Sequence, residues 1–168
     1  GVTDRLVVRR LDARQLEAVL ALLALAVAEM PADQFAALSR AEVERTFGPD
    51  GVVHGAFRGA RLVAYQSLLA HGDGADNLAG DLKLPAGSVV NLEETVVHPD
   101  ARGRGLNDRL TARSRRWARE QGFKVLATTV SPFNLGSVKS HMKAGFALEA
   151  LAQKYGGAWR YVLALALR

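Results

Sequence analysis

The sequence feature that most constrains this chain is a turn of glycine and arginine that joins an apolar segment to a long basic one, within residues 91–121. The apolar segment carries two adjacent carboxylates, and the basic segment has the spacing of a helix. Such a turn presents several backbone N–H groups at the positive end of a helix dipole, beside guanidinium charge. It predicts a binding site for a phosphate or pyrophosphate.

Length and composition indicate one globular domain. The chain has 168 residues, of which 49% are hydrophobic and 23% charged, so we expect a single domain over residues 1–168. It contains no cysteine, which excludes disulfides and thiolate chemistry, and its four histidines lack metal-ligand spacing. We therefore expect no metal.

The positive charge gathers on the predicted helix that follows the turn. Between Arg102 and Lys124 there are seven arginines and one lysine against two acidic residues, in a chain whose net charge is +5. An anionic partner near this helix is one reading. A solvated basic face is the other.

The most apolar run, Ala18 to Ala28, has about half the length that a bilayer crossing needs. It is predicted to be a buried helix. No basic leader with a small-residue cleavage site precedes it, so we expect no membrane association and a cytoplasmic location.

Hydrophobic periodicity and turn residues predict a mixed α/β order of strand, two helices, three strands, helix, strand, helix and two strands. Residues 71–87, with Gly, Asp, Asn and Pro and little periodicity, are predicted to be an exposed loop. The predicted strands are 6–10, 52–57, 62–69, 88–98, 125–130, 146–154 and 159–167, and the predicted helices are 12–31, 39–47, 106–121 and 134–144.

Two well-known phosphate-binding fingerprints do not fit the turn. The Rossmann fingerprint needs a third glycine and an acidic residue on the next strand, and this chain supplies neither. A P-loop needs Gly-Lys-Ser/Thr, which does not follow.

The stretch Val97 to Leu106, VHPDARGRGL, resembles instead the coenzyme A pyrophosphate motif of the GCN5-related N-acetyltransferases, the GNAT superfamily. Arg102 and Gly105 fit the motif, while Asn107 stands where Gly or Ala is usual. A second stretch, Asn134 to Phe146, is similar to that family's Asn-led helix ending in Gly-Phe. The resemblance implies a mixed, mostly antiparallel sheet of six to seven strands, flanked by about four helices.

This resemblance also implies an activity. An acyl group passes from acetyl-CoA, or a related acyl-CoA, to a primary amine of a small molecule or peptide by direct attack. The amine must lose a proton, the tetrahedral oxyanion must be held, and the leaving thiolate must be protonated.

For the base we favour Glu93, with Glu94 second, because adjacent strand residues point to opposite faces. Either glutamate could instead bind a substrate cation or pair with an arginine. His141 occupies the place of a tyrosine that donates the leaving-group proton in many family members, and Tyr155 is the alternative donor. The residues expected to hold the acyl-CoA are Val96, Val97, Arg102, Gly103, Arg104, Gly105, Leu106, Asn107, Asn134, Ser137 and Lys139.

Other functions stay open at this point. Arg109, Arg113 and Arg116 share one helical face and could follow a nucleic-acid backbone, and an aminoacyl-tRNA could replace acyl-CoA as donor. A non-catalytic acyl-CoA sensor is a third reading. The acceptor could be an amino acid, a polyamine, an aminoglycoside-like metabolite or a protein N-terminus, with Asp73 and Asp76 suiting a cationic amine. A homodimer through an exposed hairpin is possible.

Overall fold

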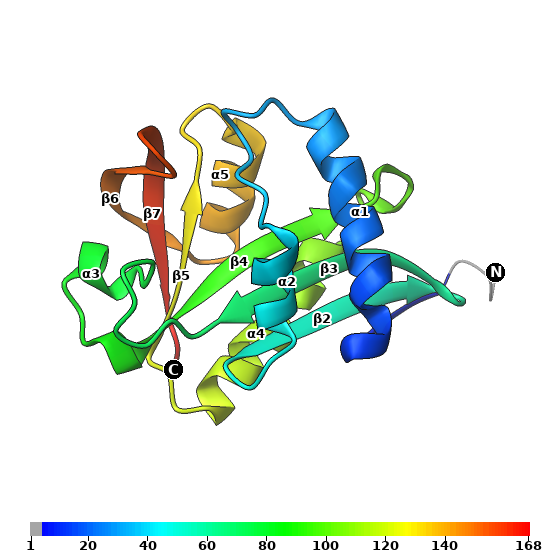
Figure 1. Ribbon diagram of the computed structural model, residues 1–168, viewed down its shortest axis with the longest axis horizontal. Helices are drawn as coiled ribbons and strands as arrows, with labels where there is room; N and C mark the ends of the chain where they lie inside the picture. Colours follow the sequence, from blue (N-terminus) through cyan, green and yellow to red (C-terminus); the bar gives the residue numbers. More distant parts are fainter. Residues whose placement is uncertain (1–4) are drawn as a thin grey trace. The chain divides into compact units, whose positions relative to one another are not determined.

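A seven-stranded sheet with the strand order β1-β2-β3-β4-β5-β7-β6 organises the chain in a computed structural model that describes residues 5–168 (Figure 1). β4 and β5 pair in parallel, and the pairs β1–β2, β2–β3, β5–β7 and β6–β7 are antiparallel. The predicted mixed, mostly antiparallel sheet is therefore confirmed. The strands are Leu6–Arg10 (β1), Gly51–Arg58 (β2), Arg61–Leu69 (β3), Val89–Val97 (β4), Val125–Val130 (β5), Ala147–Lys154 (β6) and Ala158–Ala166 (β7).

The main helices also lie where the sequence predicts them. None of the described helices combines the length and the apolar character that a membrane crossing requires. The helices are Leu16–Glu29 (α1), Arg40–Thr46 (α2), Ala79–Leu82 (α3), Leu106–Glu120 (α4) and Leu135–Lys143 (α5), with short 3-10 turns at Ala13–Gln15, Ala86–Ser88 and Pro99–Ala101.

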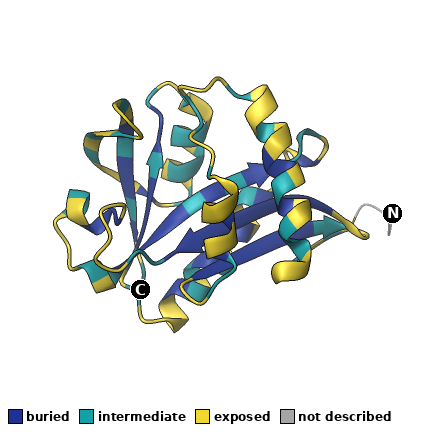
Figure 2. Cartoon of the chain, viewed as in Figure 1, coloured by how far each residue is buried: buried dark blue, intermediate teal, exposed yellow. Residues whose placement is uncertain are grey.

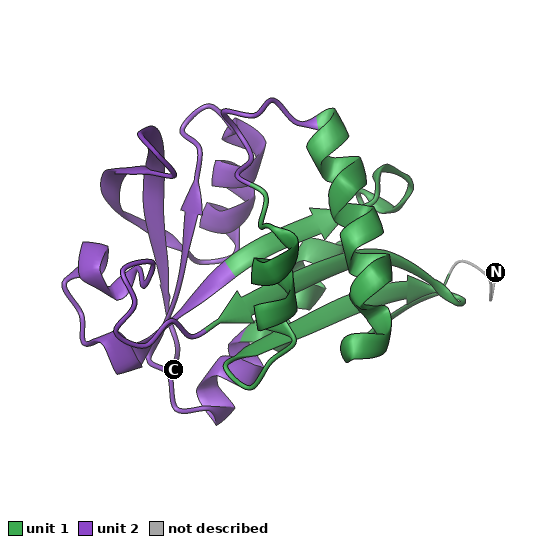
Figure 3. Ribbon diagram, viewed as in Figure 1, with its two compact units in different colours: residues 1–29, 37–69, 93–114 green, residues 30–36, 70–92, 115–168 purple. Residues whose placement is uncertain are grey.

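The described chain divides into two compact units (Figure 3). Unit 1 comprises residues 5–29, 37–69 and 93–114, and unit 2 comprises residues 30–36, 70–92 and 115–168. Two elements belong to both. β4 passes from unit 2 into unit 1 after Leu92, and α4 passes from unit 1 into unit 2 after Ser114.

In unit 1, α1 and α2 pack against the hairpin of β2 and β3, whose residues are almost all buried (Figure 2). The start of α4 packs on the same sheet through Leu106 and Leu110, which join a cluster with Ala56, Val63 and Ala64. The inward face of α4 comprises these two leucines and Ser114, which are buried, and Trp117, which is half-buried.

A buried amide ties α4 to the sheet. Gln66 of β3 is fully buried, and its Nε2 donates to Thr95 Oγ1 at 2.9 Å and to Thr111 Oγ1 at 3.2 Å. Ser114 Oγ donates to Gln66 Oε1 in return. Because a buried amide is costly unless its donors and acceptor are satisfied, this network fixes the position of α4, and so of the turn before it, relative to β3 and β4.

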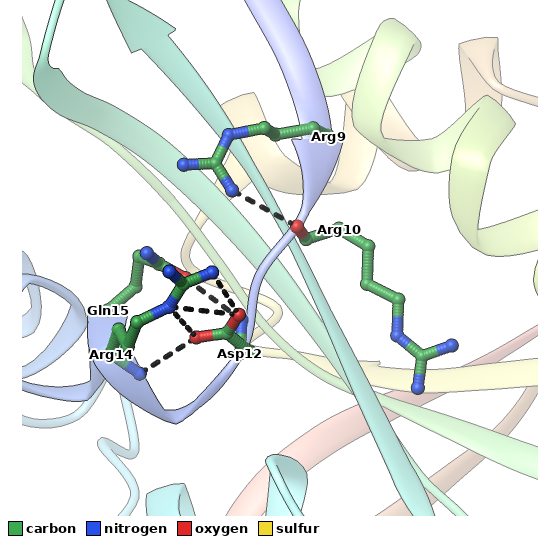
Figure 4. Close-up of polar contacts among 5 residues, drawn as sticks. All are labelled: Arg9, Arg10, Asp12, Arg14 and Gln15. Carbon is green, nitrogen blue, oxygen red and sulfur yellow. Dashed lines mark hydrogen bonds and ion pairs between the residues drawn. The ribbon is translucent and has the colours of Figure 1, made fainter.

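A capping box precedes α1, at the start of the 3-10 turn Ala13–Gln15 (Figure 4). Asp12 accepts from Arg14 N at 2.9 Å and from the Arg14 guanidinium at 2.8 Å, and Gln15 Oε1 accepts from Asp12 N at 2.9 Å. The prediction that α1 is buried was wrong. It buries one face, at Val19, Leu22 and Leu23, and leaves the rest of its apolar surface largely exposed.

In unit 2, the prediction of an exposed loop over residues 71–87 was wrong in part. Leu78 and Ala79 are buried in a cluster with Val89, and they begin α3. Two asparagines hold the segment: Asn77 Nδ2 donates to Gly72 O and Ala86 O, and Asn91 of β4 bonds to Leu78 N and Asp76 O. Side-chain bonds thus replace the hydrophobic periodicity that this segment lacks.

Candidate functional site

The carboxylates of β4 lie in contrasting surroundings. Glu94 is only 3% exposed, and its two oxygens accept hydrogen bonds from Tyr65 Oη at 3.0 Å and from Leu38 N at 3.0 Å. None of the ion pairs within residues 5–168 involves Glu94. Glu93, the residue favoured from sequence as the base, is half-buried.

Burial raises the pKa of Glu94 to about 7, although the bonds from Leu38 and Tyr65 lower it in part. Burial also raises the pKa of Tyr65, so this phenol keeps its proton and remains a donor. The hydrogen bonds from Leu38 N and Tyr65 Oη thus offset only part of the hydration that the Glu94 carboxylate loses on burial. A carboxyl group with a pKa close to neutrality is suited to general base catalysis.

The turn before α4 has the geometry of an anion site. Gly103 and Gly105 have φ values of 75° and 70°, in the left-handed region that favours glycine. The first amides of α4 have no helical acceptor, and the exposed Arg102 and Arg104 precede them. A pyrophosphate fits these groups by charge and by hydrogen bonding.

Arg102 is held by a protein carboxylate in this structure. Its Nη2 lies 2.8 Å from Glu29 Oε2, and the two side chains are 59% and 43% exposed. An exposed pair of this kind contributes about 0–1 kcal/mol. A pyrophosphate can therefore displace Glu29, which competes with it for the guanidinium.

Four arginines of α4 have partners within the protein, while Arg115 has a buried Nε without a hydrogen-bond partner. Arg109 Nη2 donates to Leu6 O at 3.2 Å and Arg113 Nη2 donates to Val8 O at 3.4 Å, both on β1. In unit 2, Arg116 pairs with Glu120, and Arg119 donates to the Arg168 carbonyl. Arg109 and Arg113 of the face predicted to suit a nucleic acid thus bond to β1, whereas Arg116 makes only an exposed pair within its own helix.

In unit 2, α5 begins at Asn134, whose Oδ1 accepts from Ser137 N at 3.2 Å and so caps the helix. Asn134, predicted to hold the acyl-CoA, thus also stabilises the start of α5. Lys139 is exposed. One turn further on, His141 packs edge-on against Phe146, with ring centroids 5.3 Å apart.

The protonation state of His141 follows from its contacts. Its Nδ1 lies 2.7 Å from the carbonyl oxygen of Ser137, which can only accept, so Nδ1 carries the hydrogen. Burial lowers the pKa of His141, although the Ser137 carbonyl opposes the shift. The ring is then neutral at pH 7 with a lone pair on Nε2, which suits an acceptor better than an acid.

Tyr155 lies in the turn between β6 and β7. Its φ is +52°, and the residue is 62% exposed. The phenolic oxygen is 2.7 Å from Thr129 Oγ1 of β5. Non-glycine residues in this backbone region are uncommon and gather at functional sites.

The predicted site residues thus form one group in each unit. Unit 1 contains the carboxylates, the backbone of Val96 and Val97, and the turn at residues 102–107; unit 2 contains Asn134, Ser137, Lys139, His141 and Tyr155. Sequence reasoning missed Tyr65 and Leu38, since nothing in an apolar strand or a helix approach marks them as partners of a carboxylate. Over the described residues, no three His, Asp or Glu side chains are grouped as a metal site would require.

Comparisons with known proteins show the family and the fold of this chain. The sequence model described as "Acetyltransferase (GNAT) family" matches residues 19–146. Similar solved structures include yncA from Salmonella typhimurium with its cofactor acetyl-CoA, at 19% identity, a TM-score of 0.76 and coverage of 98% of this chain and 95% of that one. No curated protein matches the chain in sequence.

Two further structures show the same fold. The acetyltransferase of the GNAT family from Streptococcus pneumoniae has 17% identity and a TM-score of 0.74, with coverage of 98% of this chain and 100% of that one. The ribosomal-protein-S18-alanine N-acetyltransferase from Escherichia coli has 14% identity and a TM-score of 0.72, with coverage of 97% and 94%.

Proposed function

Because this chain belongs to the acetyltransferase (GNAT) family, we propose that it transfers the acetyl group of acetyl-CoA to a primary amine of a small molecule or peptide by direct attack. The observation that carries the mechanism is the buried carboxylate of Glu94, whose pKa burial raises to about 7. The acetyl-CoA of the yncA structure supports the choice of donor. We propose that both units serve one catalytic domain.

In the proposed reaction, the amine nitrogen attacks the thioester carbonyl carbon. The C–N bond forms, the C–S bond breaks, and the proton of the amine passes to Glu94, which later releases it to solvent. Glu93 is the second candidate for this role, as the neighbouring carboxylate of β4. A base with a pKa near the operating pH combines a deprotonated state with enough basicity to accept the proton.

For the donor, we propose that the pyrophosphate binds at the turn from Arg102 to Asn107 and the first amides of α4. The left-handed glycines of this turn and its exposed arginines support this placement. The pantetheine arm and the oxyanion are assigned to the backbone of Val96 and Val97. At the start of α5 and within it, the proposed contacts with the donor are Asn134, Ser137 and Lys139.

For the leaving thiolate, we propose Tyr155 as the proton donor ahead of His141, with the resulting phenolate regaining a proton from solvent. A phenol holds a transferable proton at neutral pH, whereas His141 presents an unprotonated Nε2 because its Nδ1 donates to Ser137 O. Thr129 Oγ1, 2.7 Å from the phenolic oxygen, orients the tyrosine.

A panel of amines with acetyl-CoA, followed by release of free thiol, tests the proposal. Thiol release that depends on the amine is expected, with acetyl-CoA binding seen by calorimetry. The matched variants Glu94→Gln and Glu93→Gln then separate the two carboxylates. The proposal fails if acetyl-CoA does not bind, or if aminoacyl-tRNA is the only donor that supports transfer.

A further inference from the structure

A second buried charge, which the proposed mechanism does not use, lies in unit 2. Arg160 of β7 is only 4% exposed. Its Nη1 donates to the backbone oxygen of Trp159 at 2.8 Å, and its guanidinium carbon lies 5.7 Å from the centre of the Tyr155 ring. No carboxylate within residues 5–168 forms an ion pair with it.

The contrast with a neighbouring cation shows how unusual this is. Lys154, at the end of β6, is about one-fifth exposed and has its own acid, Asp81 Oδ2, 2.6 Å from its Nζ. Arg160 is more deeply buried, and the protein contacts of its guanidinium are a neutral carbonyl and an aromatic face. Buried charges in proteins are normally paired, because the loss of hydration is otherwise uncompensated. Unlike lysine, arginine cannot escape this cost by losing its proton.

The turn above this guanidinium is built from backbone conformations that are rarely used. Tyr155, Gly156 and Gly157 all have positive φ, at 52°, 81° and 121°. They return the chain so that Tyr155 reaches back to Thr129 and lies near Arg160. A non-glycine residue held in this region persists only when its surroundings over-determine it, so the position of the tyrosine beside the buried cation is specified.

From these observations we propose that Arg160 binds an anionic group of the acyl acceptor, and that the acceptor is an amine that also carries a carboxylate, as an amino acid does. The assignment rests on the proposed acetyltransferase function. A guanidinium offers paired donors that match the two oxygens of a carboxylate. Bound there, the carboxylate supplies the counter-charge that the protein itself withholds and holds the acceptor beside Tyr155.

The test compares matched acceptors. The common amino acids and their carboxamides are assayed with acetyl-CoA by thiol release, and O-phosphoethanolamine is compared with ethanolamine to tell a carboxylate from a phosphate. For the best amino acid, we expect kcat/KM to exceed that of its carboxamide by about 100-fold. Equal rates for the two would overturn the inference while leaving the proposed acetyltransferase function intact. So would a preference for the phosphate.

Variants assign the preference to the residue. Arg160→Met should abolish the preference for the carboxylate, and Arg160→Lys, which keeps the charge but not the fork, should retain part of it with a higher KM. Lys154→Gln is the matched control, since Lys154 already has Asp81, and should keep the full preference. Acetyl-CoA affinity by calorimetry should be unchanged in all three, which separates this inference from the donor site.

If Arg160→Met does not fold, Arg160→Lys decides between binding and structure. A purely structural arginine predicts equal losses for the amino acid and its carboxamide, and that result overturns the inference. If no amine is acetylated and acetyl-CoA does not bind to the wild-type protein, the proposed function itself has failed.

Discussion

Unit 1 buries a carboxylate, Glu94, and unit 2 buries a guanidinium, Arg160, and neither forms an ion pair with another of the described residues. Glu94 can lose its charge by taking up a proton, and its pKa has risen to about 7 accordingly. Arg160 has no such route. The carboxylate can therefore adjust to burial by itself, whereas the guanidinium stays charged, which is the basis for the anion that we propose it binds.

The largest effect we expect is on turnover. Glu94→Gln should lower kcat by about 100- to 10,000-fold, the range for loss of a general base. Because the base must be deprotonated, wild-type kcat/KM should fall as pH drops below about 7, following the Glu94 pKa. Steady-state rates from about pH 5 to about pH 9, in steps of about half a pH unit, measure this fall in kcat/KM.

Glu93→Gln is the matched control and should keep the fall of kcat/KM at low pH. If instead Glu93→Gln abolishes it and Glu94→Gln does not, the two carboxylates exchange roles and the contrast between the units loses its catalytic half.

Stability should show the same contrast as a pH dependence. The folded-state pKa of Glu94 is raised from 4.5 to about 7, so its contribution is full below pH 4.5 and is lost as pH rises through about 7. Glu94→Gln should therefore gain about 3 kcal/mol in the free energy of unfolding above pH 7, relative to its effect at pH 4. Urea melts at the two pH values measure this.

His54 should oppose this trend in the wild-type protein. Burial, with Arg113 and Arg10 nearby, lowers its pKa from 6.5 to about 4, so its contribution is full above pH 6.5 and is lost as pH falls through about 4. Between these values the slopes of His54 and Glu94 have opposite signs and nearly cancel. Glu94→Gln should expose a stability that rises with pH there; a flat profile in that variant would contradict either shift.

A smaller effect is expected at the donor to Glu94. Tyr65→Phe removes one of the two hydrogen bonds that lower the pKa of Glu94. The apparent pKa of the kcat/KM profile should therefore move upward, by about one pH unit. A shift downward would mean that Tyr65 does not stabilise the ionised carboxylate.

The smallest effects should come from the exposed pair of Arg102 and Glu29, which sharpens the comparison because its charges are matched and hydrated. Arg102→Gln should raise the Kd for acetyl-CoA by about tenfold. Glu29→Gln should lower it by no more than about fivefold, since only an exposed pair is lost. Calorimetry measures both, and tighter binding by Arg102→Gln would exclude it from the pyrophosphate site.

Much of the fold was predictable because its signals are local. The capping box of Ser39 and Glu42 is present, with Ser39 N donating to Glu42 Oε1 at 2.9 Å, and the left-handed Gly122 follows the end of α4. Strand limits follow from apolar runs bounded by turns, as with β5 at Val125–Val130. Such features need only residues close in sequence.

The site was less predictable because its chemistry depends on distant partners. Glu93 and Glu94 are equivalent by sequence, and the burial of the second comes from Tyr65 and Leu38, which are 29 and 56 residues away. Likewise, the sequence of β7 does not show that Arg160 is buried without a carboxylate partner. Residues 71–87 were misread for the same reason, since Asn91 holds them from another element.

The arginines of α4 have a consequence for the protein at high concentration. β1 stands at one end of the strand order, and Arg109 and Arg113 occupy the carbonyls of Leu6 and Val8. An edge strand with free carbonyls is a template for pairing with another chain. By occupying these carbonyls, the arginines of α4 make β1 a poorer template for a strand of another chain.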